Sequence, residues 1–213
     1  MKSIRREDLP DFFRKIADMF EKHADELCEM DAKLGDGDLG LTMKKGFGAL
    51  PEVVTELEEP DIGKAIMKCG MKMSSLIPST MGFLMGSVLM GGGKAIAGKA
   101  EISGSGMAAF LRGYADGIKK RGKCEPGDRT ILDAVDGAAE AAEALLRSCP
   151  DASLEAVADA AAKGAESGAE ATKNMIPKYG KAAVHKDAAK GICDQGAVAG
   201  KYLVESIADF CRE

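Results

Sequence analysis

The chain has 213 residues, a formal net charge of −5, only 5% aromatic residues and no tryptophan. A core of this length built from Ala, Leu, Ile, Val and Met favours close-packed helices over a β-sandwich. The negative charge, and the lack of Lys/Arg clusters interleaved with aromatic residues, argue against a nucleic-acid binder. There is no long apolar span and no apolar segment behind the first basic residues, so we expect neither a membrane helix nor a signal peptide, and a cytoplasmic protein.

Nothing in the composition divides the chain, so we expect one domain over residues 1–213. The six cysteines lack C-x-x-C spacing and fall mostly in helical patterns. We therefore expect small buried thiols in a reducing compartment, not a disulfide framework or a zinc site.

The hydrophobic periodicity predicts eight amphipathic helices and no strand. Asp8 is the expected cap of the first helix, Asp61 caps the third, and Ser103 or Ser105 caps the fifth. Pro51 should kink or interrupt the second helix. The fourth is apolar on all sides, which indicates burial, with a membrane span as the rival interpretation. The predicted helices cover residues 9–30, 41–58, 62–73, 80–96, 103–121, 131–147, 154–175 and 197–212.

The segments between these helices predict where a site lies. Short links between successive helices imply antiparallel neighbours. Four irregular stretches are each separated from the next by two helices, so they should meet at one end of the array. These stretches are 31–40, 74–82, 122–130 and 177–196.

The first of these stretches is the most unusual, because Asp31, Asp36 and Asp38 fall within eight positions, with glycines at 35, 37 and 40. Carboxylates this close repel one another unless a hard cation neutralises them, and oxygen ligands favour Mg²⁺ or Ca²⁺ over zinc. The glycines allow positive φ angles and a close approach to whatever the metal holds. The alternative is a solvated acidic turn.

Two further observations bear on the metal hypothesis. A helix is expected to begin at Gly40 or Leu41, and a helix N-terminus beside a carboxylate-bound cation suits a phosphate. The EF-hand does not fit, because the run that starts at Asp36 lacks alternate ligands and a glutamate at its twelfth position.

Four motifs occur in order from near the N-terminus to the last helix. Together they resemble the nucleotide-binding L subunit of dihydroxyacetone kinase, the DhaL family. The motifs are Asp31…Gly-Asp36-Gly-Asp38-x-Gly40-x-Thr-Met43, Thr80-Met-Gly82-x-x-x-Gly86, Arg121-Gly-Lys-x-Glu-Pro-Gly127-Asp128-x-Thr130-x-x-Asp133-Ala, and Gly191-x-x-Asp194-x-Gly196-Ala.

The resemblance implies an all-α fold, an up-and-down barrel of eight antiparallel helices with ADP or ATP at one end. It also implies two Mg²⁺ ions, held by the three motif aspartates, that bind the nucleotide phosphates. Carried over by motif, the resemblance implies phosphate contacts from Leu39, Gly40, Leu41 and Thr42, and further nucleotide contacts from Thr80 and Met81. It places Gly122 and Ile131 on the adenine side, and the rest of the pocket is formed by Asp194, Gln195 and Gly196. The residues implied in catalysis are Asp31, Asp36, Asp38 and Lys181.

The chain departs from the family pattern at three of these positions. Leu39 replaces a usual histidine, Met81 a usual serine, and Lys181 aligns with a usual arginine. A lysine meets a phosphate as a point charge but cannot make a bidentate guanidinium contact. These changes leave the aspartates in place and bear on the substrate or partner.

The leading hypothesis is the nucleotide-carrying subunit of a kinase for dihydroxyacetone or a related short keto-sugar. No residue resembles a carbonyl-capturing nucleophile, so the sugar should sit on a separate K-type subunit. The phosphate could come from ATP, or from a phosphohistidine phosphocarrier of the phosphotransferase system that recharges bound ADP. A homodimer is left open. The alternative is a non-catalytic, nucleotide-sensing regulatory protein with the same fold.

Overall fold

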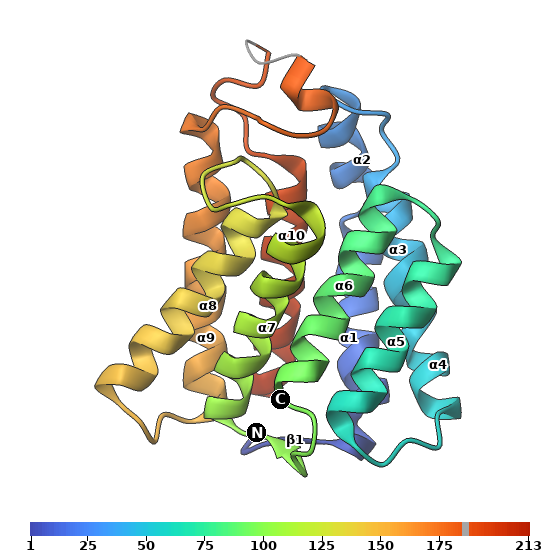
Figure 1. Cartoon of the computed structure of the whole chain (residues 1–213), viewed down its shortest axis with the longest axis vertical. Helices are drawn as coiled ribbons and strands as arrows, with labels where there is room; N and C mark the ends of the chain where they lie inside the picture. Colours follow the sequence, from blue (N-terminus) through green and yellow to red (C-terminus); the bar gives the residue numbers. More distant parts are fainter. Residues whose placement is uncertain (185–187) are drawn as a thin grey trace.

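The computed structural model describes residues 1–184 and 188–213, without the side chain of Lys181, and this part of the chain is mostly helical (Figure 1). The predicted all-α fold is confirmed. The α-helices are α1 (Leu9–Lys22), α2 (Ala24–Ala32), α3 (Leu39–Gly48), α4 (Leu50–Glu56), α5 (Ile62–Leu76), α6 (Thr80–Ala95), α7 (Gly104–Gly122), α8 (Ile131–Ser148), α9 (Leu154–Ala171) and α10 (Gln195–Arg212). Short 3₁₀ turns are η1 (Arg6–Asp8), η2 (Thr172–Asn174) and η3 (Lys181–Val184).

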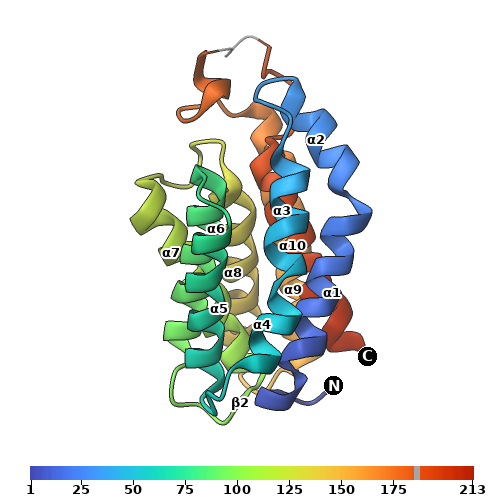
Figure 2. The ribbon, with the colours of Figure 1, turned by 90° about the vertical axis from the view of Figure 1, so that its right-hand side faces the viewer.

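The long helices run up and down and close on themselves. From α5 to α10 each helix packs against the next along the chain, and α10 packs against α1, while α1 contacts both α3 and α4 (Figures 1 and 2). This closed antiparallel array is the architecture that the resemblance implied.

Two predicted helices are each divided in the structure. The first breaks at His23, whose ring stacks on Tyr202 of α10 with centroids 4.0 Å apart. The second breaks at Ala49, and Pro51 lies in the first turn of α4, as its fixed φ and missing N–H allow.

The N-terminal segment corrects two predictions. The absence of strands was wrong, because β1 (Ile4–Arg5) pairs antiparallel with β2 (Glu101–Ile102), with Ile4 opposite Ile102. Both isoleucines are fully buried, so burial of β-branched side chains stabilises this pair. Asp8 holds the predicted N-cap position of α1, but its side chain makes no cap hydrogen bond; its carboxylate instead accepts the N–H of Arg5 at 2.7 Å and so closes η1.

The other predicted caps are confirmed. Asp61 accepts the N–H of Lys64 at 2.9 Å at the start of α5, and Ser103, not Ser105, caps α7. Each cap satisfies one N–H that the first helical turn leaves without a helical partner.

The core is continuous and helix α6 lies within it. Val88 and Leu89 of α6 are fully buried, and a side chain at Gly91 would clash with the carbonyl of Gly113 in α7, so only glycine permits this approach. Among the described residues, no helix is both long and apolar enough to cross a membrane. The six cysteines are free: Cys69, Cys124 and Cys211 are buried as expected, whereas Cys28 and Cys193 are half-buried and Cys149 is exposed.

The predicted gathering of loops is confirmed. The described parts of 31–40, 74–82, 122–130 and 177–196 lie at the upper end of the molecule in Figure 1, and the chain termini lie at the other end. Contacts join these segments: Lys178 pairs with Asp128, and the Tyr179 hydroxyl donates to the Lys123 carbonyl at 2.6 Å.

Candidate metal and nucleotide site

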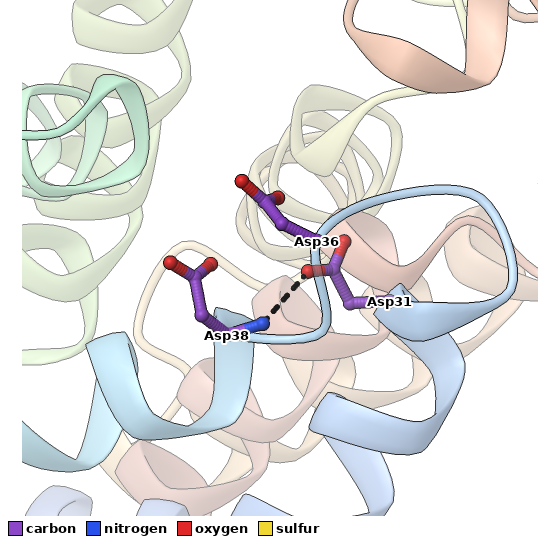
Figure 3. Close-up of side chains that lie close together, drawn as sticks. All are labelled: Asp31, Asp36 and Asp38. Carbon is purple, nitrogen blue, oxygen red and sulfur yellow. Dashed lines mark hydrogen bonds between the residues drawn. The ribbon is translucent and has the colours of Figure 1, made fainter.

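Asp31 is the anchor of the acidic loop. It lies in the last turn of α2 and is buried, with 7% of its surface exposed. Its Oδ2 accepts the backbone N–H of Asp38 at 3.2 Å (Figure 3) and that of Gly37 at 2.9 Å. Its Oδ1 accepts the side-chain amide of Gln195 at 3.2 Å. One carboxylate therefore fixes the loop that follows it and the first turn of α10.

Asp36 and Asp38 are exposed and bring their carboxylates to the same place as that of Asp31 (Figure 3). One oxygen from each of the three residues lies within 4.8 Å of the others. Oxygens that ligate one Mg²⁺ or Ca²⁺ ion, at about 2.1 to 2.5 Å, are separated by at most about 4 to 5 Å. The donors are all oxygen, so their chemistry and spacing fit a hard divalent cation. In the described part of the chain, no other group of three acidic, His or Cys side chains meets this spacing.

Glycine is required at positions 35, 37 and 40 for different structural reasons. Gly37 has a φ of +77°, which favours glycine, whereas a side chain at Gly35 would clash with the Asp31 carboxylate. A side chain at Gly40 would clash with the carbonyl of Ala24 in α2. The expected close approach at Gly40 is thus between α3 and α2, and positive φ is found at Gly37 alone of the three.

The first turn of α3 follows directly from the acidic loop. Asp38 holds the N-cap position, but its side chain makes no cap hydrogen bond; its carbonyl accepts the N–H of Thr42 at 2.9 Å. The N–H groups before Thr42 have no helical partner and share the end of α3 with the carboxylates. Leu39 is only 4% exposed and its side chain belongs to the core, so its backbone N–H is what it offers a ligand.

The start of α6 forms a second helix N-terminus at this end of the molecule. Ser79 caps α6 by accepting the N–H of Gly82 at 3.1 Å, and Thr80 is exposed at the first helical position. Met81 is half-buried and packs against the core.

The end of α7 and the starts of α8 and α10 also lie at this end. Gly122 ends α7, and Ile131 begins α8, where it is almost fully buried behind the Thr130 cap. A side chain at Gly196 would reach within 3.4 Å of the Ile131 nitrogen, so α10 begins directly against the start of α8.

Asp194 caps α10 from a buried position. Its Oδ2 accepts the N–H of Ala197 at 2.9 Å, and its Oδ1 lies 3.5 Å from Nη1 of Arg129. Burial raises the pKa of Asp194 to about 6, although the Ala197 hydrogen bond and the charge of Arg129 oppose the shift.

The remaining site prediction concerns Lys181. It is the first residue of η3, but its side chain lies outside the described residues. The structure therefore brings the backbone of this segment to the correct end and leaves the role of the lysine a prediction.

Sequence reasoning missed Arg129, which is 2% exposed. An arginine between Asp128 and Thr130 in a polar connector suggests a solvated side chain, because arginine is rarely buried without partners. Its position directly before a helix cap was the one available signal.

Comparison with known proteins identifies the family of this chain. The sequence model of the DAK2 domain matches residues 33–209. The chain belongs to the DAK2 domain family. The resemblance to DhaL is thereby confirmed, and relatives with that name are among the most similar.

Two curated relatives differ in how much of their length the chain spans. It is 27% identical to the ADP-binding subunit DhaL of the PEP-dependent dihydroxyacetone kinase of Escherichia coli (strain K12), over 99% of this chain and 100% of that one. It is 30% identical to the D-erythrulose kinase of Mycolicibacterium smegmatis, over 92% of this chain and 34% of that one. The chain thus matches one whole subunit and about a third of a longer kinase.

A solved structure shares the fold. The dihydroxyacetone kinase of C. freundii, in complex with AMP-PNP and Mg²⁺, aligns with a TM-score of 0.69 at 21% identity, over 94% of this chain and 33% of that one.

Proposed function

We propose that this chain is the nucleotide-binding subunit of a dihydroxyacetone kinase. It would bind ADP or ATP with Mg²⁺ and transfer a phosphoryl group to dihydroxyacetone, or a related short keto-sugar, on a separate K-type subunit. The observation that carries the proposal is the convergence of three carboxylates, within 4.8 Å, beside the N-terminus of α3. The names of the E. coli subunit and the C. freundii complex support it.

Asp31, Asp36 and Asp38 would hold two Mg²⁺ ions at this site. Bound Mg²⁺ neutralises charge on the phosphates and on the transferring group. The protein's own contribution is position: Asp31 is fixed by three hydrogen bonds, and the first-turn N–H groups and dipole of α3 favour an anion. We assign phosphate contacts to the backbone of residues 39–42 and a charge contact to Lys181.

The nucleotide itself would lie between the starts of α3, α6, α8 and α10. We assign Thr80 and Met81 to one wall of this site. The adenine side would be formed by Gly122 and Ile131, with Asp194, Gln195 and Gly196 closing the pocket. Gly196 supports this assignment because α10 begins there directly against the start of α8, which brings these residues together.

The K-type subunit would cover the loop end, because phosphoryl transfer requires its sugar beside the phosphate. Large exposed apolar side chains gather at this end, which favours a protein partner there. They are Leu41, Phe83, Ile176, Tyr179 and Val184. A phosphohistidine phosphocarrier that recharges bound ADP would need the same access, and a homodimer stays a prediction.

We also propose that residues 1–213 act as one domain. One cluster of buried hydrophobic residues extends from Ile4 to Cys211, which supports a single cooperative unit.

The test combines nucleotide retention with reconstituted turnover. The purified chain should retain or bind ADP in Mg²⁺, and with a K-type partner it should phosphorylate dihydroxyacetone. Supplying either ATP or a phosphohistidine phosphocarrier identifies the donor. Failure to bind any nucleotide in Mg²⁺ would refute the proposal.

A regulatory nucleotide sensor is the second candidate. The burial of Leu39, where the family usually has histidine, favours it because the loop then lacks one polar side chain. If the biological effect survives Asp36→Asn combined with Asp38→Asn while phosphoryl transfer is lost, the regulatory function is the correct one.

A further inference from the structure

Arg129 is a fully buried guanidinium on a left-handed backbone. Its side chain has 0% exposure and its φ is +61°, a conformation that residues other than glycine, asparagine and aspartate rarely adopt. It lies in the connector between α7 and α8, directly before the Thr130 cap. A charged side chain is seldom held in this way without a specific set of partners.

The partners of Arg129 lie far along the chain. Its Nη2 donates to the carbonyls of Ile192 at 2.9 Å and Ala189 at 3.2 Å. Its Nη1 lies 3.5 Å from the Asp194 carboxylate, and neither Nη1 nor Nε has a hydrogen-bond partner among the described residues. The guanidinium therefore connects the start of α8 to the segment that leads into α10.

That segment leads to the carboxylate cluster. Asp194 caps α10, and Gln195, the next residue, donates its side-chain amide to Asp31 at 3.2 Å. On the opposite side, Gly196 lies against Ile131 at the start of α8. The contacts thus run without a gap from Arg129 through Asp194 and Gln195 to Asp31.

We propose that Arg129 is a positioning residue that couples the adenine side of the site to the carboxylate cluster. It holds residues 189–194 against the start of α8, so that Gln195 reaches Asp31 and Gly196 stays against Ile131. This inference rests on the proposed function, because the coupled ligands are ADP and Mg²⁺. Coupling between two ligands is reciprocal and is measured as the ratio of ADP dissociation constants without and with Mg²⁺.

Arginine suits this role better than lysine. Its planar fork presents donors toward two carbonyls and a carboxylate at once, whereas an ammonium group is a single point of charge. A neutral side chain of similar length would fill the space and lose every one of these contacts.

The experiment compares Arg129→Met with Arg112→Met. Arg112 is a matched control, since it is a partly buried arginine in α7 that pairs with Asp136 and Glu143. Both changes should lower the Tm. We expect Arg129→Met to reduce the coupling ratio at least about fivefold, the lower end of common coupling factors, with Arg129→Lys between it and wild type. Arg112→Met should leave the ratio unchanged.

Gln195→Ala tests the same connection without removing a buried charge. It should reduce the coupling ratio as well, and the double variant with Arg129→Met should lose no more than the larger single loss. If Arg129→Met does not fold, Gln195→Ala decides alone. An unchanged coupling ratio in Gln195→Ala, or in a folded Arg129→Met, overturns the inference.

Hydrogen exchange separates this inference from the proposed function. In the ligand-free protein, Arg129→Met should accelerate exchange of the amides in 189–197 but not of those in α9, and Arg112→Met should not affect 189–197. Equal protection in wild type and Arg129→Met refutes the positioning role. A wild-type chain that binds no nucleotide in Mg²⁺ refutes the proposed function, and the exchange comparison still decides the role of Arg129.

Discussion

Two aspartates at helix N-cap positions, at opposite ends of the molecule, are used in different ways. The carboxylate of Asp61 stabilises the fold, because it accepts the N–H groups of Lys64 at 2.9 Å and Gly98 at 2.7 Å. Asp38 makes no side-chain cap and joins Asp31 and Asp36 instead. Aspartate at an N-cap normally stabilises the helix through its carboxylate. The carboxylate of Asp38 makes no such bond, which leaves it available to a ligand, and functional sites commonly depart from local stabilising rules in this way.

The two ends as a whole show the same contrast. At the end without the acidic loop, β1 pairs with β2 and the N-terminal amine donates to the Cys211 carbonyl at 3.1 Å. At the other end, the carboxylates of Asp31, Asp36 and Asp38 are gathered within 4.8 Å of one another. We expect the first end to contribute stability and the second, under the proposed function, to contribute ligand binding.

Asp36→Asn combined with Asp38→Asn should have the largest effect. Binding of ADP in Mg²⁺ should weaken at least about a hundredfold, or about 2.8 kcal/mol, because two charged ligands are lost. Calorimetric titration measures this affinity. Retained Mg²⁺-dependent binding would show that these carboxylates do not hold the ion.

Asp194, a third N-cap aspartate, should make stability depend on pH. Its ordinary pKa is 3.8, and burial raises the folded value to about 6. Between these values the folded state binds more protons at Asp194 than the unfolded state, so the contribution of Asp194 to the free energy of unfolding should fall as pH rises, by up to about 1.4 kcal/mol per pH unit. Because the other carboxylates titrate in both proteins, denaturant titrations from pH 4 to 6 should give a more negative slope in wild type than in Asp194→Asn. Equal slopes would contradict the assignment.

Gly40→Ala should disturb the loop end through packing. The methyl group of the new alanine would clash with the Ala24 carbonyl, so we expect a loss of about 1 to 3 kcal/mol in unfolding free energy and weaker ADP binding. Gly48→Ala is the control in the same helix, because nothing lies within 4 Å of the added atom. It should be neutral or stabilising by up to about 1 kcal/mol. Equal effects of the two changes in denaturant unfolding would refute this packing argument.

Asp61→Ala should have the smallest effect and no effect on ligands. Loss of the cap should lower the unfolding free energy by about 1 kcal/mol, and Asp61→Asn should restore most of it. ADP binding in Mg²⁺ should match wild type in both variants. A change in ADP affinity would mean that the two ends are not separate in function.

The helices could be predicted from the sequence because their signals are local. The apolar period of a helix runs along the helix itself, and the caps Asp61 and Ser103 directly precede the helices that they begin. The break at His23 carries no proline or glycine signal and instead accompanies packing against Tyr202, which is distant in sequence. The β1–β2 pair was missed because strands of two residues show no periodicity.

The site divides in the same way. The carboxylate cluster was predictable because all three aspartates fall within eight positions of the sequence, and Gly35 and Gly37 between them permit its geometry. The burial of Arg129 was not predictable, since its partners Ala189 and Ile192 follow 60 and 63 positions later. Only the packing of α8 against α10 brings these residues together.

A calorimetric titration of the wild-type chain with ADP, in Mg²⁺ and in EDTA, tests the central claim most directly. The carboxylate cluster predicts saturable ADP binding in Mg²⁺ that is lost or much weakened in EDTA. Equal ADP affinity under both conditions would contradict a site in which these aspartates hold the nucleotide through a metal ion.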